Sequence, residues 1–347
     1  MEDFKIEKIG DKVVINGITY VKETVSSPKE ETPEDVHPQK EKKVYSFGVF
    51  SDVHMPWKNG MKNDEMCYED FTRALKYCND YGVKHIGICG DITSEGILYD
   101  LSNYRKVLRE FAAYSTIPVY TCLGNHETWH ENWHNNETND FHAPFPNVWF
   151  DYTGMGKGMK GDVEICPSCS ADVCINTQGE HHIFLSVESH DWVSGKCGDV
   201  YKADARQWLG SILEKYKNER CYIYMHFFFP SRCGNYGKVY NNNLWLSGDA
   251  LKGLEALADK YPNSIWFSGH SHCEWSLDEN IYKNAKGGYC VHIPSCGEPR
   301  GVKKGEMYSI PEGSEFAVVD VYKSKVVVHG ISLVSNKLKE VKTYELV

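Results

Sequence analysis

The sequence predicts an α/β protein with mixed β-sheets, and two observations lead to this fold class. From Val44 onward, short apolar runs typical of buried strands alternate with segments whose apolar residues recur at helical spacing. Toward the C-terminus the helical spacing disappears, and strand-like runs follow one another directly. Alternation followed by a run of strands is typical of chains that build both parallel and antiparallel sheet.

The N-terminal segment differs from the rest of the chain. Residues 1–25 are predicted to form a small β-hairpin, because Asn16-Gly17, a favoured type I′ turn pair, lies between two β-prone runs. Residues 26–43 carry three Pro and many charges without apolar periodicity, which predicts a flexible linker. The hairpin could pack on the main domain, residues 44–347, or attach the protein to a partner, and the sequence leaves both open.

The first half of the main domain is predicted to contain three strands separated by two helices. Strands are expected over residues 45–50, 85–90 and 117–123, and helices over residues 65–81 and 98–114. The first helix has Phe71, Leu75 and Cys78 on one stripe, with Gly82 as a stop signal. Residues 128–180 are rich in Trp, Asn and Gly and show no clear periodicity.

The second half continues the alternation and ends in strands. Strands are expected over residues 182–187, 221–226 and 264–270, with a helix over residues 203–216 and another that begins after Ser247 as its N-cap. The tail has strand-like runs at residues 289–295, 316–322 and 325–333, which we expect to pair antiparallel.

Composition narrows the class of protein. The formal net charge of -10 argues against long nucleic acids as partners, because binding many phosphates needs a basic face. Residues 1–10 lack the apolar centre of a signal peptide, and no stretch reaches about 18 apolar residues, so neither secretion nor a membrane span is expected. Thirteen Cys in such a chain favour free thiols in a reducing compartment, the cytoplasm.

Metal-binding side chains follow one predicted strand after another. Asp52 and His54 follow the first strand, and since they are two residues apart their side chains point the same way on an extended chain. The other strand ends carry Asp91, then Asn125 with His126, then His226, and last His270 with His272. In open α/β sheets ligands bind beyond the carboxyl ends of the strands, so these side chains are expected along one rim.

A zinc protease offers an alternative interpretation of residues 124–134, GNHETWHENWH. The pattern His-Glu-x-x-His occurs there twice, from His126 to His130 and from His130 to His134. That site requires a helix, which brings both imidazoles to one face. Here the first His directly follows a strand and a Gly turn, and the next residues have no amphipathic pattern. We therefore expect His130 and His134 to be loop residues.

Five motifs in order carry a family resemblance: Ser-Asp-Val-His at 51–54, Gly-Asp at 90–91, Gly-Asn-His-Glu at 124–127, Met-His at 225–226 and Gly-His-Ser-His at 269–272. Together they strongly resemble the calcineurin-like metallophosphoesterase superfamily, from about residue 45 to the C-terminal strands. The resemblance implies a four-layer αββα sandwich of two mixed β-sheets. Residues 1–43 lie outside it.

The resemblance also implies a centre of two metal ions. Asp52, His54 and His272 would hold the first ion, Asn125, His226 and His270 the second, and Asp91 would bridge both. This donor set suits Mn, Fe, Zn or Ni better than Ca²⁺ and does not choose among them. A metal-bridging hydroxide would attack phosphorus, and His126 would protonate the leaving group as general acid. Glu127 would orient an imidazole, and Asn125 and His126 would also contact the substrate.

Departures from related groups favour the phosphodiesterase-like members. Purple acid phosphatases place Tyr where this chain has Ser94, and phosphoprotein phosphatases place Arg where it has Leu123. The Asp-x-His and Gly-His-x-His motifs resemble those of these members, and the resemblance implies phosphodiesters as substrates. A phosphomonoesterase of the same fold and a tethered scaffold protein that keeps the fold are the alternatives. Residues 1–43 would serve for the attachment.

Other residues allow a functional or a structural interpretation. Arg232 and Arg300 follow strands near the rim and could bind phosphate, or they could be surface residues. Asp191 and its neighbours His190 and Trp192 also follow a strand. Four cysteines could form a structural metal site or remain free thiols: Cys166, Cys169, Cys174 and Cys197. Three tryptophans of the irregular segment could stack on a base or sugar, or pack within the loop: Trp129, Trp133 and Trp149.

Overall fold

A computed structural model describes residues 41–55, 64–94, 98–127, 163–168, 172–177, 179–187, 200–234, 246–304 and 306–347, together with three strands within residues 6–21. The chain divides into two compact units, Met1–Glu41 and Lys42–Val347. The first unit contains an antiparallel sheet of β1 (Ile6–Ile9), β2 (Lys12–Ile15) and β3 (Ile18–Val21). Strands β2 and β3 pair with Ile15 opposite Ile18, and β1 adds a strand that the sequence analysis did not predict. The domain boundaries at residues 26 and 44 stay predictions.

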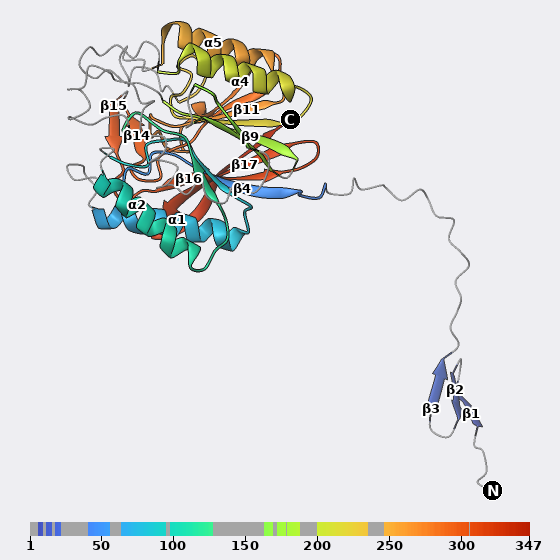
Figure 1. Cartoon of the computed structure of the whole chain (residues 1–347). Helices are drawn as coiled ribbons and strands as arrows, with labels where there is room; N and C mark the ends of the chain where they lie inside the picture. Colours follow the sequence, from blue (N-terminus) through green and yellow to red (C-terminus); the bar gives the residue numbers. More distant parts are fainter. Residues whose placement is uncertain are drawn as a thin grey trace. The chain divides into compact units, whose positions relative to one another are not determined.

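The second unit is built on two large sheets, of which the first has the order β18-β17-β16-β4-β5-β6. Its parallel half consists of β4 (Tyr45–Phe50), β5 (Ile86–Ile88) and β6 (Val119–Thr121). Its antiparallel half consists of β16 (Glu315–Val321), β17 (Val326–Val334) and β18 (Lys337–Leu346). Helices α1 (Asp64–Tyr81) and α2 (Leu98–Ala112) cover its outer face (Figure 1), where Phe71 and Phe111 pack into one cluster with Phe50 and Phe316.

The second sheet has the order β12-β13-β11-β10-β9-β8-β7. Its central strands β9 (Glu180–Leu185), β10 (Cys221–Met225), β11 (Ser264–Ser268) and β13 (Tyr289–His292) are parallel to one another. The outer strands β7 (Val163–Ile165), β8 (Val173–Thr177) and β12 (Ile281–Lys283) pair antiparallel. Helices α4 (Ala203–Lys215) and α5 (Gly248–Lys260) cover the face away from the first sheet (Figure 1).

The inner faces of the two sheets pack against each other and form the central core. Phe47 of β4 contacts Tyr222 of β10 and Phe267 of β11 edge to face, and Val319 of β16 belongs to the same buried cluster. The layers are therefore helix, sheet, sheet and helix, which confirms the predicted αββα sandwich with two mixed sheets. A short helix, η1 (Asp278–Asn280), and a two-stranded sheet of β14 (Arg300–Lys303) and β15 (Glu306–Ser309) complete the described part.

One local expectation was wrong, and another was confirmed in position only. Strand β13 lies parallel to β11, not antiparallel like the rest of the tail, because β12 intervenes in the chain and reverses its direction before β13. Ser247 occupies the N-cap position of α5 but makes no capping hydrogen bond through its side chain. None of the helices in the described part of the chain has the length and apolarity that crossing a bilayer requires.

Candidate metal centre

The packing of the two sheets brings the seven predicted ligands to one rim. Strands β4, β5 and β6 end next to Asp52 with His54, Asp91 and Asn125, while β10 and β11 end next to His226 and the pair His270 and His272. All seven side chains are buried. Six of them form two groups within which the ligand atoms lie within 4.8 Å of one another, and a third such group joins His54 and Asp91 with His126. Asn125 adjoins the group that contains His226. The structure therefore brings together every residue that the sequence placed in this set.

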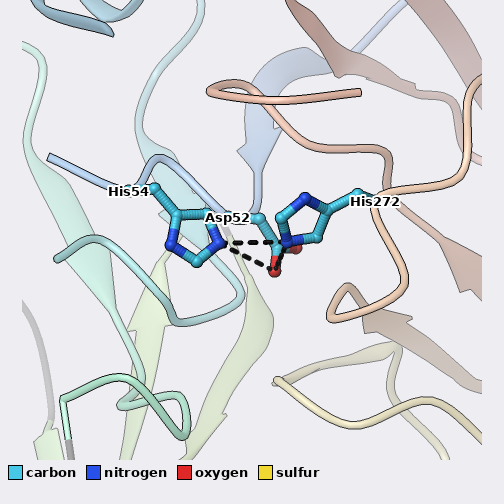
Figure 2. A group of neighbouring side chains, drawn as sticks. All are labelled: Asp52, His54 and His272. Atoms are coloured by element: carbon cyan, nitrogen blue, oxygen red, sulfur yellow. Dashed lines mark hydrogen bonds and ion pairs between the residues drawn. The ribbon is translucent and has the colours of Figure 1, made fainter. Parts of the chain in front are cut away.

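The first group, here the first half-site, contains Asp52, His54 and His272 (Figure 2). The Nε2 atom of His272 lies 3.1 Å from Oδ1 of Asp52 and 3.0 Å from Nε2 of His54. The Nε2 atom of His54 lies 3.8 Å from the same carboxylate oxygen. Figure 2 shows the two imidazole rings converging on this carboxylate, so three donor atoms from both sheets surround one point.

The second half-site contains Asp91, His226 and His270, with Asn125 beside them. The Nε2 atom of His226 lies 3.0 Å from Oδ2 of Asp91, 3.1 Å from Nδ1 of His270 and 2.8 Å from Oδ1 of Asn125. Oδ2 of Asp91 also lies 3.9 Å from Nε2 of His54, a member of the first half-site. This carboxylate thus stands between the two groups, where a bridging ligand has to be.

The donor atoms fit a pair of transition-metal ions. In each half-site two imidazole nitrogens lie 3.0 or 3.1 Å apart. When two nitrogens bind the same ion at 2.0–2.1 Å and the angle between the two metal–nitrogen bonds is a right angle, the nitrogens lie about 3 Å apart. Imidazole, carboxylate and amide donors suit Mn, Fe, Zn and Ni alike. The geometry therefore accommodates the predicted cations without choosing among them.

Five of the seven residues have a left-handed backbone. Their φ angles are positive: 50° at Asp52, His54 and Asp91, 71° at His270 and 61° at His272. Residues with a Cβ seldom adopt this conformation, and each instance costs of order 1 kcal/mol or more. Such residues persist only where the surrounding structure holds them, and here the left-handed turn points each side chain toward the shared centre.

Two glycines of the motifs allow the backbone to come this close. A Cβ atom at Gly124 would lie 2.1 Å from Oδ1 of Asp91, and a Cβ at Gly269 would lie 1.7 Å from Oγ of Ser51 and 2.3 Å from Oδ2 of Asp52. Both separations are far below any contact distance between atoms. Only glycine therefore fits next to the two carboxylates.

The electrostatics of the centre keep its carboxylates charged. Burial opposes this, but His272 and His54 hold the pKa of Asp52, and His226 and His126 hold that of Asp91, below the usual range. Burial lowers the pKa of His54 and of His270, which keeps these rings neutral. His226 differs, because Asp91 and Asp52 outweigh its burial and raise its pKa to about 9. Binding of a cation there would release this proton.

Main-chain carbonyls orient two of the rings, which the sequence analysis did not reveal. Nδ1 of His226 donates to the carbonyl of Cys89 at 2.9 Å, and Nδ1 of His272 donates to that of Glu298 at 2.9 Å. Because these bonds place the proton on Nδ1, Nε2 of each ring is directed at the centre. Such support fixes the tautomer and orientation of a metal ligand. A carbonyl acceptor has no side-chain signature, so no motif could have identified it.

His126 lies at the edge of the centre, as expected from its place after Asn125. Its main-chain NH donates to Oδ1 of Asp91 at 2.9 Å, and Nδ1 donates to the carbonyl of Ser94 at 2.5 Å. Its Nε2 lies 3.9 Å from Oδ2 of Asp91, and 13% of the side chain is exposed. Burial lowers the pKa of His126 to about 4, so the ring is neutral near pH 7.

Glu127 acts on the backbone and not on an imidazole, which corrects the sequence-based expectation. Its carboxylate accepts hydrogen bonds from the main-chain NH groups of Gly124, Asp91 and Thr93 at 2.6, 3.0 and 2.9 Å. The Thr93 hydroxyl donates to it as well, at 2.9 Å. Glu127 thereby ties the loop after β6 to the loop after β5, and so fixes the turn that carries Asp91.

The two arginines differ. Arg232 donates to Asn284 Oδ1 at 2.6 Å and to Asp259 Oδ2 at 2.9 Å, and only 7% of its side chain is exposed. These contacts favour a structural role over the predicted binding of phosphate. Arg300 lies next to a ligand, because its main-chain NH donates to the carbonyl of His272 at 2.8 Å, and 27% of its side chain is exposed.

Several sequence-based expectations concern residues outside the described ranges. These are His130 and His134, the three tryptophans Trp129, Trp133 and Trp149, the segment 190–192, and the cysteines Cys169 and Cys197. Cys166 and Cys174 are described, and both are buried and outside any disulfide. A structural metal at the four cysteines stays a prediction.

Comparison with known proteins supports this description of the fold. A family model for calcineurin-like phosphoesterases matches residues 45–274. A crystal structure of a dimetal phosphatase from Danio rerio is 13% identical, with a TM-score of 0.53 over 88% of this chain and 99% of that one. Vps29 from Entamoeba histolytica, complexed with Zn²⁺, is 11% identical with a TM-score of 0.36 over 87% of this chain and 98% of that one. No curated protein sequence matches the chain.

Proposed function

The chain belongs to the calcineurin-like phosphoesterase family, and on this basis we propose that it is a hydrolase of phosphodiesters with a centre of two metal ions. The observation that carries the proposal is the position of Asp91. Its Oδ2 atom lies 3.0 Å from His226 and 3.9 Å from His54, so one carboxylate reaches both half-sites. A buried carboxylate between two clusters of imidazoles is suited to a pair of cations and is costly without them.

The roles of the residues follow from their positions. Two bound cations would supply Lewis acidity toward the phosphoryl oxygens and a deprotonated water near neutral pH. Asp52, His54 and His272 would hold one cation, and Asn125, His226 and His270 the other, with Asp91 shared. The left-handed turns and the buried hydrogen bonds would keep these donors in place while the charge on the phosphoryl group redistributes.

His126 would donate a proton to the leaving oxygen. The Ser94 carbonyl holds Nδ1 of the ring, which directs Nε2 toward the centre. The low pKa means that the ring is neutral in the free protein, and that it would take up a proton from water when the negative charge of a bound phosphodiester next to Nε2 favours the imidazolium form. Arg300, next to His272, would contact a phosphate oxygen that does not react.

The preference for diesters over monoesters rests on the sequence motifs Asp52-x-His54 and His270-x-His272. A matched pair of substrates tests it: bis-p-nitrophenyl phosphate and p-nitrophenyl phosphate share one leaving group and differ in the second ester. Purified protein should contain about two transition-metal ions per chain and, with Mn²⁺, should hydrolyse the diester with the higher kcat/KM. The reverse order would identify a phosphomonoesterase.

The same assay tests the proposal as a whole. Asp91→Asn keeps the size of the side chain but removes the shared charge, so it should lower the metal content and abolish turnover. Lys76→Gln, at an exposed position on α1, is the matched control and should change neither. Wild-type protein that takes up no metal and, with Mn²⁺ added, hydrolyses none of a wider panel of esters would leave the scaffold as the remaining function.

A further inference from the structure

Ser295 is a buried residue outside the five motifs that bonds to both sides of a turn. Its hydroxyl donates to the main-chain carbonyl of Asp52 at 2.7 Å. The same oxygen accepts from the NH groups of Gly297 at 3.1 Å and Glu298 at 2.6 Å. The side chain is fully buried, so these three bonds are made without competition from water.

The segment that follows Ser295 contacts both parts of the first half-site. On the side of β4, the NH groups of Cys296 and Gly297 donate to the carbonyls of Ser51 and Asp52 at 2.9 and 3.0 Å. On the side of β11, the carbonyl of Glu298 accepts from the His272 ring, and the NH of Arg300 donates to the His272 carbonyl. Residues 295–300 therefore connect the loop that carries Asp52 to the loop that carries His272.

This connection matters because the two loops belong to different sheets. Asp52 follows β4 of the six-stranded sheet, and His272 follows β11 of the seven-stranded sheet. Asp52 and His272 both have left-handed backbones, which need support from their surroundings. The second half-site has additional support that does not involve Ser295: His226 is held by Cys89, and the turn of Asp91 by Glu127. The two half-sites also touch, since the NH of His270 donates to the Asp52 carboxylate at 2.9 Å.

We propose that Ser295 is a positioning residue for the first half-site alone, one that sets the distance between Asp52 and His272 and hence the affinity of that half-site for its cation. The inference rests on the proposed metal centre. Without the hydroxyl, the turn at residues 295–298 loses the atom that closes it. The Glu298 carbonyl can then move away from His272, whereas the contacts of His226 and Asp91 are unchanged.

The test is a titration of full-length protein, stripped of metal with a chelator, with Mn²⁺. Calorimetry measures the binding steps, and electron paramagnetic resonance measures the state of the bound ions. Wild-type protein should take up two ions, and the loaded centre should give the signal of a spin-coupled pair. Ser295→Ala should weaken one of the two binding steps about 10- to 100-fold, as expected for the loss of a residue that supports a ligand, and leave the other unchanged. At one equivalent of Mn²⁺, Ser295→Ala should give the resonance signal of a single, uncoupled Mn²⁺ ion.

Ser264→Ala is the matched control. Ser264 is also fully buried, at the start of β11, and its hydroxyl donates to the Tyr261 carbonyl at 2.6 Å and accepts from the Trp266 indole at 2.9 Å. It lies at the opposite end of β11 from His272, so both binding steps should match wild type. If Ser295→Ala does not fold, Ser295→Cys, which keeps the shape but bonds weakly, carries the same expectation.

Three outcomes would overturn the inference. Two binding steps of wild-type affinity in Ser295→Ala would show that the hydroxyl does not position the half-site. Equal weakening of both steps, or the same weakening in Ser264→Ala, would show a general loss of stability. Wild-type protein that binds no Mn²⁺, Zn²⁺ or Fe²⁺ would overturn the proposed metal centre together with the inference.

Discussion

At the scale of single residues, the candidate centre separates residues that would bind a cation from one that would move a proton. His126 lies as close to Oδ2 of Asp91 as His54 does, 3.9 Å, but 13% of its side chain is exposed, whereas the side chain of His54 is 2% exposed. A residue in that position can change protonation state without disturbing the ligands. The two roles therefore predict different consequences of substitution.

His126→Ala should reduce turnover while both metal ions remain bound. Loss of a general acid costs roughly 10²- to 10⁴-fold when the leaving group is poor. An ester with an alkyl leaving group should show this full loss, and bis-p-nitrophenyl phosphate a much smaller one, because p-nitrophenolate leaves without a proton. The comparison requires kcat for both substrates and the metal content of the variant. An equal loss on both substrates would contradict the assignment.

Gly269→Ala should disrupt the first half-site. The added Cβ would lie 1.7 Å from Ser51 Oγ and 2.3 Å from Asp52 Oδ2, so the Asp52 side chain has to leave its position. We expect one metal ion fewer per chain by elemental analysis. Gly210→Ala on α4 is the control, since its Cβ would meet only Leu257 Cδ2 at 3.4 Å and a helical Gly→Ala change stabilises by about 0.5–1 kcal/mol. Full metal content in Gly269→Ala would refute the steric argument.

At the scale of elements, the sequence predicted what periodicity and strand ends encode. The helix expected at residues 65–81 is α1, Asp64–Tyr81. The strand before Asp52 ends at Phe50 as predicted, and the strands before Asp91 and His226 end at Ile88 and Met225, two residues and one residue earlier than predicted. Apolar spacing encodes these elements directly. Strands β14, β15 and β18 were missed because they are short or mostly polar, and their formation depends on partners distant in sequence.

The hydrogen bonds that hold the predicted ligands in place could not be predicted from the sequence either. Ser295 looks like any polar residue after a strand, and its partner is the carbonyl of a residue 243 positions earlier. Glu127 stands in a recognised motif, but its four donors come from main-chain NH groups and one hydroxyl. Hydrogen bonds to the main chain impose no residue type on the partner, so only the fold reveals them.

Strand β16 leads to a prediction about pH. Burial raises the pKa of Glu315 from 4.5 to about 7, although its carboxylate accepts from the Trp275 NH at 2.8 Å. Because the folded-state pKa is the higher one, the proton is bound more tightly in the folded chain. This difference in pKa contributes about 3 kcal/mol to the free energy of unfolding. The contribution is complete below pH 4.5 and is lost as the pH rises through 7.

Glu315→Gln removes this dependence. Between pH 5 and 8, the free energy of unfolding of wild type should fall relative to that of Glu315→Gln by up to about 3 kcal/mol. Urea unfolding at several pH values, with chelator present so that metal binding does not contribute, measures the difference. Glu312→Gln, an exposed carboxyl on the same approach to β16, should follow wild type. Parallel curves for wild type and Glu315→Gln would show that the carboxyl is not buried as described.

At the scale of the whole molecule, the second unit contains every candidate catalytic residue. Its sheets, helices and core lie within Lys42–Val347. We propose that residues 1–43 attach the enzyme to a partner or larger assembly and take no part in the chemistry. Their composition, with its run of Pro and charged residues, suits a tether better than a core.

A chain that begins at Lys42 should therefore fold, bind two metal ions and hydrolyse bis-p-nitrophenyl phosphate at close to the full-length rate. It keeps the ion pair between Lys43 and Asp320 at 3.1 Å and the hydrogen bond from the Val44 NH to the Val321 carbonyl at 2.7 Å. A chain that begins at Val44 loses the ion pair and the contact of Lys43 with the Tyr81 ring, both far from the centre, so it should match in activity. Insoluble or inactive protein from both truncations would assign residues 1–41 to the catalytic fold.

Each half-site draws its donors from both sheets, and this has a mechanical consequence. His54 and His272 are 218 positions apart in the chain, and Asn125 and His226 are 101 apart. An ion bound by such a pair links the two sheets of the sandwich, and the link is lost when the ion dissociates. At a free-ion concentration one hundred times the dissociation constant, each ion adds about 2.7 kcal/mol to the free energy of unfolding. The concentration of free metal ions would then govern the free energy of unfolding of the chain as well as its rate of turnover.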